Sequence, residues 1–146
     1  MNTLKDIKVA ENYIKRALCD PFAFRASSFK KRERDFYRGV DRFIDHNTSR
    51  ARRFNTIKNG LILVSGALLM GAATHIVPVD ILNQAELFNA ALFSLALAGG
   101  TQAFKTAFDN NHQQATAIKS SVDEFRDDRY NYGLNNLAAI KVDTSQ

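Results

Sequence analysis

The chain has 146 residues, one cysteine and a formal net charge of +5. That length allows one compact domain or a membrane hairpin with small flanking parts, and a single cysteine excludes an intramolecular disulfide. Residues 1–58 hold 15 Lys and Arg against 7 Asp and Glu, whereas residues 105–146 hold 5 against 6. The hydropathy pattern predicts an all-α fold, with a two-helix transmembrane hairpin flanked by an N-terminal helical region and a long C-terminal helix.

Residues 1–20 are predicted to form an amphipathic helix, because apolar side chains recur at steps of three and four residues. These side chains are Leu4, Ile7, Ala10, Ile14, Ala17 and Leu18. The helix should stop at Asp20, since the residue before a proline avoids helical angles.

Residues 21–58 read as a short linker followed by a basic helical region. Its expected apolar stripe consists of Phe29, Phe36, Tyr37, Val40, Phe43 and Ile44. The polar run at residues 46–49 predicts a break or kink. From Arg50 onward the helical period continues into the next segment without interruption.

Residues 59–105 contain the predicted hairpin. No residue between Lys58 and Asp80, or between Glu86 and Lys105, carries a fixed charge. A helix of about 20 apolar residues spans the roughly 30 Å hydrocarbon core of a bilayer. The alternative is a soluble bundle with two apolar core helices, which would need many amphipathic neighbours to cover them.

The basic residues also predict a topology. Arg50, Arg52, Arg53 and Lys58 precede the first span, Lys105 follows the second, and the connecting turn has neither Lys nor Arg. Because positive charge is retained on the cytoplasmic side, both termini should be cytoplasmic, and the membrane would be the inner (plasma) membrane if the protein is bacterial. The same five residues are candidate contacts for anionic lipid head groups. Topology and solubility alone would also explain them, and nucleic acid is the less favoured partner.

Small residues recur at every fourth position in both spans. Such spacing lets helix backbones approach closely, within one hairpin or between subunits. The candidate packing or oligomer residues are Ala67, Gly71, His75, Ala90, Ser94 and Ala98, and the candidate pore-facing residues are Thr74, His75, Ser94 and Gln102.

Residues 106–146 are predicted to continue the second span as a cytoplasmic tail helix with a short disordered end. Its apolar stripe includes Ala115, Ile118, Val122 and Phe125, and we expect it to dock on the two N-terminal stripes. Residues 131–134, which include Gly133, predict a turn.

Catalytic or metal-binding patterns are not evident. His46, His75 and His112 are scattered and none has a carboxylate or cysteine at metal-ligand spacing. There is no phosphate-binding glycine loop and no nucleophile motif. We therefore expect a protein that is not an enzyme and uses no cofactor.

The order of basic helix, span, short turn, span and long tail helix resembles the SLATT-like family of two-transmembrane effectors. The likeness is carried by YRGVDRFIDHNTSRARRFNTIKNGLILVSGALLMGA and by FKTAFDNNHQQATAIKSSVDEFRDDRYNYG. The resemblance implies a protein that oligomerises and breaches the inner membrane.

The leading hypothesis is a small membrane protein that self-associates and forms a pore or disrupts the membrane. Three alternatives stay open: an accessory subunit of a larger membrane complex, a phage lysis or ejection protein, and a soluble helical module that binds nucleic acid.

Overall fold

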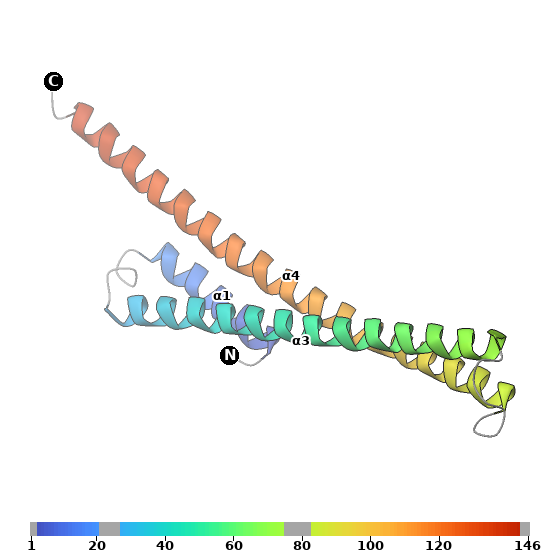
Figure 1. Ribbon diagram of the computed structural model, residues 1–146. Coiled ribbons are helices and arrows are strands. Elements are labelled where there is room, and N and C mark those ends of the chain that lie inside the picture. Colours follow the sequence, from blue (N-terminus) through green and yellow to red (C-terminus); the bar gives the residue numbers. More distant parts are fainter. Residues whose placement is uncertain (1–2, 21–26, 75–82, 144–146) are drawn as a thin grey trace. The chain divides into compact units, whose positions relative to one another are not determined.

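The computed structural model describes residues 3–20, 27–74 and 83–143, with residues 133–143 described through their backbone. Within these ranges the fold is all-α, as predicted, with three helices and no strand. Helix α1 spans Leu4–Cys19, α3 spans Ser27–Thr74 and α4 spans Gln84–Asp143 (Figure 1). The expected linker at residues 21–26, and His75 with the first part of the connecting turn, lie outside the described residues.

The chain divides into two compact units. Residues 1–45 and 111–146 form the first, which we call the bundle unit, and residues 46–110 form the second, the hairpin unit. The bundle unit contains α1 and part of each long helix. The hairpin unit contains the apolar parts of α3 and α4, which include the two predicted spans.

Local signals at both ends define α1. The Thr3 hydroxyl accepts a hydrogen bond from the Asp6 backbone N–H at 3.2 Å, and the Asp6 carboxylate accepts one from the Thr3 N–H at 3.1 Å. This reciprocal capping box satisfies two N–H groups that the helix leaves unpaired. The helix ends at Cys19 with Asp20 in extended conformation, as expected for the residue before proline.

The core of the bundle unit confirms the predicted stripes. Its buried members come from all three helices and are Ile7, Ile14, Ala17, Leu18, Phe29, Phe36, Val40, Ala115, Ile118 and Val122. Leu4, Ala10, Tyr37, Phe43, Ile44 and Phe125 pack against them and are partly buried. Each helix therefore buries one stripe at helical spacing, which is how an amphipathic helix is stabilised.

The break predicted at residues 46–49 is wrong, because α3 continues through them. Asn47 is 3% exposed and Ala51 is 5% exposed, so two residues four apart share the buried face of one helix. The low helix propensity of Asn, Thr and Ser costs only about 0.5 kcal/mol per residue. Packing of the buried face on both sides of the run outweighs that cost.

The turn predicted at residues 131–134 is also wrong. Helix α4 runs through Gly133 to Asp143, so it includes residues 142 and 143 of the end expected to be disordered, while residues 144–146 lie outside the described part. A glycine inside a helix costs about 1 kcal/mol relative to alanine, which does not by itself end a helix that is hydrogen-bonded on both sides. The predicted continuation of the second span into one long helix is confirmed.

Candidate functional site

The seam of the hairpin unit is lined by a regular series of buried and half-buried side chains, in which small and polar residues outnumber Phe and Leu. Most buried and half-buried positions on each helix follow one another at alternating steps of three and four residues, the spacing of packed antiparallel helices. On α3 the series is Ala51, Phe54, Lys58, Leu61, Ser65, Leu68 and Ala72; on α4 it is Leu87, Ala91, Ser94, Ala98, Thr101, Lys105 and Phe108. Ala91 is 0% exposed and Ser65 is 1% exposed, so the most fully buried residues of the seam are small.

Most of the large apolar side chains in the charge-free stretches of the same unit face outward. Leu63 is 75% exposed, Met70 72% and Phe93 66%. Others that stay exposed are Ile62, Val64, Phe88, Leu92, Leu95 and Leu97. In the most apolar window of each long helix, 6% of the α3 residues and 17% of the α4 residues are buried. The chain therefore leaves uncovered the surface that a soluble core helix would bury.

Two helices in the described part of the chain are long and apolar enough to cross a membrane. In α4 the charge-free stretch from Leu87 to Phe104 is roughly 27 Å long at 1.5 Å per residue, close to the bilayer core.

Three hydroxyl groups in these apolar stretches bond to the backbone of their own helix. Ser65 donates to the carbonyl of Leu61 at 2.8 Å, and Thr74 donates to the carbonyl of Met70 at 2.7 Å. Thr101 donates in the same way to Ala98 at 2.8 Å. Each of these three hydroxyl groups thus makes a hydrogen bond without water, which an apolar medium requires.

Aromatic and basic residues gather where the charge-free stretches end. The Phe54 ring stacks on Phe104 and Phe108, with centroids 5.5 and 5.6 Å apart. The Arg50 guanidinium lies 5.5 Å from the Phe108 centroid, and Lys105 pairs with Asp109 at 2.8 Å. Of the other predicted lipid contacts, Arg52 and Arg53 are exposed and Lys58 is half-buried.

The predicted packing and pore residues fall into several groups. Ala98 is buried, and Ser94 and Gly71 are half-buried. Ala67, Ala90, Thr74 and Gln102 are exposed, and His75 lies outside the described residues. The structure thus brings Ser94 and Ala98 to the seam and leaves Ala67 and Ala90 on outer faces. An oligomer interface or a pore through these residues stays a prediction.

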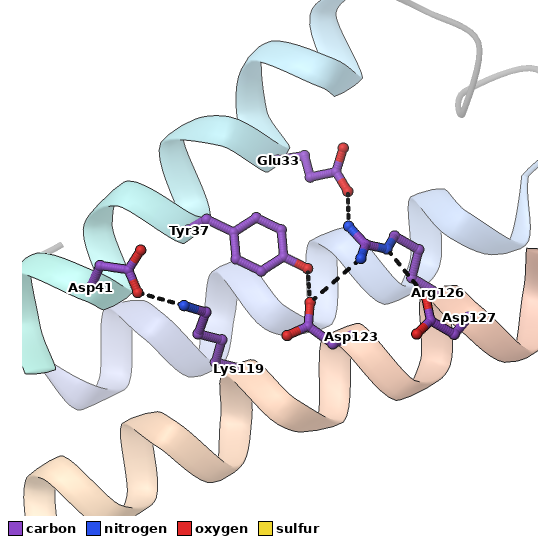
Figure 2. A network of polar contacts seen from close by, with 7 residues as sticks. All are labelled: Glu33, Tyr37, Asp41, Lys119, Asp123, Arg126 and Asp127. Carbon is purple, nitrogen blue, oxygen red and sulfur yellow. Dashed lines mark hydrogen bonds and ion pairs between the residues drawn. The ribbon is translucent and has the colours of Figure 1, made fainter.

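The bundle unit contains a polar network between α3 and α4 that sequence reasoning missed (Figure 2). The Tyr37 hydroxyl donates to Asp123 at 2.5 Å, and Lys119 pairs with Asp41 at 2.7 Å. Arg126 lies 3.8 Å from Glu33, 3.9 Å from Asp123 and 3.6 Å from Asp127. Glu33, Tyr37 and Asp41 of α3 contact Arg126, Asp123 and Lys119 of α4, respectively. The residue numbers increase along α3 while those of the partners decrease along α4, so these two segments are antiparallel. Exposed pairs of this kind contribute about 0–1 kcal/mol each and serve mainly to fix the register.

Two pKa values in this network are raised. Burial is the main cause for Tyr37, and its hydrogen bond to Asp123 and that carboxylate's charge raise the pKa further. For Lys119 the hydrogen bond to Asp41 raises the pKa against a smaller opposing effect of desolvation. Both groups keep their protons at neutral pH, so neither of them acts as a general base or a nucleophile there.

Among the described residues, no cluster of three or more His, Cys, Asp or Glu could hold a metal ion. Comparison of the chain with family models, with curated proteins and with solved structures found no match. The candidate site is therefore defined by the hairpin unit itself.

Proposed function

We propose that the chain is a small, non-enzymatic integral membrane protein whose hairpin unit spans the bilayer. The observation that supports this most is the distribution of side chains in that unit: its most fully buried residues, Ala91 and Ser65, are small, while Leu63, Met70 and Phe93 face outward. In water this exposed apolar surface would be unfavourable, at about 25 cal/mol per Å². In a bilayer the same surface contacts apolar lipid tails, so its exposure is not unfavourable. Close packing of small residues then holds the helices together.

The boundary of the membrane would lie at the aromatic and basic cluster. Phe54, Phe104 and Phe108 suit the interface, and Arg50 and Lys105 beside them suit anionic head groups. Under this proposal both termini are cytoplasmic, because the positive charge lies on this side of the spans.

Self-association in the bilayer is the second part of the proposal. A Cβ atom added at Gly66, Gly99 or Gly100 would meet nothing within 4 Å, so these backbone positions are open to another helix. Ala67 and Ala90 add further small residues on exposed faces. A pore would require several copies, because one hairpin cannot enclose a polar path. This reading agrees with the resemblance to the SLATT-like effectors.

The test has two measurements. Membranes from expressing cells are washed with alkaline carbonate, and the proposal predicts that the protein stays with the membrane pellet. Release into the supernatant would contradict the membrane assignment and favour a soluble assembly.

The detergent-corrected mass of the purified protein is then determined, with Ala67→Leu and Ala90→Leu as variants. A discrete homo-oligomer that these variants dissociate is expected, since added side chains would separate the helices. A monomer would contradict self-association and favour an accessory subunit, whose outer faces contact other proteins.

A further inference from the structure

The bundle unit has a cationic pocket on the N-terminal part of α3. A pocket of about 480 Å³ is lined by Ser27, Lys30, Lys31, Arg34, Asp35 and Arg38. All six residues are exposed, and four of them are cations. We propose that this pocket binds a compact anion that carries two or more phosphate groups.

The four cations of the pocket stand against a single carboxylate in its lining, Asp35, so the pocket keeps an excess of positive charge. Within the described ranges of the chain no ion pair involves Lys30, Lys31, Arg34 or Arg38, whereas the cations of the polar network, such as Lys119, are paired. Three of the cations follow one another at steps of four residues, and like charges at that spacing repel. The arrangement therefore lowers helix stability until an anion neutralises it.

The position of the pocket on the helix adds to this effect. Helix α3 has no acidic residue in its first turn. Cations near a helix N-terminus oppose the helix dipole, while an anion there is favoured by the dipole. The Ser27 hydroxyl supplies a neutral donor at the same end.

The size and lining of the pocket favour a compact ligand over a nucleic acid. Its volume falls in the range of small-molecule sites, about 300–1,000 Å³. Lys30, Arg34 and Arg38 spread over about 12 Å of helix, so they can contact separate phosphate groups of one ligand. Among the described residues no aromatic side chain lines the pocket, and the neighbouring Phe29 and Phe36 are 3% and 1% exposed, so these residues offer bases no stacking surface.

Recognition by charge alone does not distinguish a free polyphosphate from a polyphosphorylated lipid head group. Asp35 lies within the lining and repels either ligand. This gives the proposal a test in both directions, because loss of a cation should weaken binding and loss of the Asp35 charge should strengthen it.

Isothermal titration of the full chain in a non-ionic detergent measures binding of tripolyphosphate. We expect binding at one site, weakening as salt screens the charges. Arg34→Gln should weaken it about fivefold, the effect of losing one charge about 4 Å from the anion in water, and Asp35→Asn should tighten it. The matched control is Lys8→Gln, which removes the same charge from an exposed position on α1 and should change affinity less than twofold.

Two further titrations identify the source of the anion. Mixed micelles containing a polyphosphorylated phosphoinositide that compete with tripolyphosphate would support the proposal with a lipid as the ligand. An oligonucleotide that binds more tightly, with affinity rising with its length, would overturn it in favour of nucleic acid. Absence of tripolyphosphate binding, or equal losses for Arg34→Gln and Lys8→Gln at unchanged helicity, would also overturn it. The proposal rests on the bundle unit alone, so its outcome is independent of the membrane assignment.

Discussion

Phe93 lies near the middle of the charge-free part of α4 and is 66% exposed. Replacing it by arginine should strongly oppose membrane insertion. On the insertion scale a central Phe contributes about −0.3 to −0.6 kcal/mol and a central Arg about +2.5 to +3.5, a change of about 3–4 kcal/mol. This corresponds to a loss of roughly 100-fold or more in the insertion equilibrium. In a water-exposed helix the same substitution would stay within about 0.5 kcal/mol.

The assay is translation of Phe93→Arg in the presence of microsomes, with a glycosylation acceptor placed in the connecting segment at residues 75–82. Glycosylation reports that the segment has crossed the membrane, and it should fall sharply in the variant. The control is Val9→Arg on α1, a position that is 64% exposed but outside the spans, where glycosylation should match the wild type. Equal glycosylation of Phe93→Arg and wild type would refute the membrane reading of this outer face.

Three other substitutions test the packing and the polar network. Phe36→Ala should destabilise the bundle unit by about 3–5 kcal/mol in denaturant unfolding followed by circular dichroism, because Phe36 is 1% exposed, whereas Val9→Ala should cost less than about 0.5 kcal/mol. Ala98→Leu should cost about 1–3 kcal/mol by overpacking the seam, and the exposed Ala96→Leu should be tolerated in the same thermal scan; equal losses would contradict the assigned seam. The raised pKa of Tyr37 means that folding favours its protonated form, so stability should be full below the ordinary pKa of about 10 and fall as the pH rises above it. Tyr37→Phe should make that fall shallower between pH 9 and about 12, and an unchanged slope would contradict the proposed coupling.

The amphipathic stripes could be predicted from sequence because they depend only on helical spacing. Ile7 and Ile14 on α1, Phe36 and Val40 on α3, and Val122 on α4 are all buried where the period places them. Apolar residues spaced at three and four positions have no other way to leave water together.

The residues of the seam were harder to predict, because small residues in the same span can be grouped into more than one series, and each series lies on a different face of the helix. A strict step of four residues advances about 40° around a helix at each step, whereas alternating steps of four and three follow a neighbouring helix. The strict series picks Ala90, which is exposed, and the alternating series picks Ala91, which is 0% exposed. Which series is used depends on the partner helix, and that information is not local.

The polar network and the two missed helix continuations have a similar cause. Glu33 and Arg126 are far apart in sequence, and their pairing depends on the register of two antiparallel segments. The polar run at residues 46–49 has the composition of a turn, but Asn47 is buried by contacts that lie outside the run. Local composition describes the preference of the isolated segment, and packing decides the outcome.

The most direct test of the outward apolar faces is the collision accessibility of spin labels in the reconstituted protein. Cys19→Ser removes the only cysteine, and single labels are then placed at Met70 and Phe93, with Val9 as a reference outside the spans. In a membrane-spanning hairpin, labels at Met70 and Phe93 should collide with dissolved oxygen far more than with a water-soluble nickel chelate, while the label at Val9 should show the reverse. Strong collision with the nickel chelate at Met70 and Phe93 would contradict a membrane-spanning hairpin.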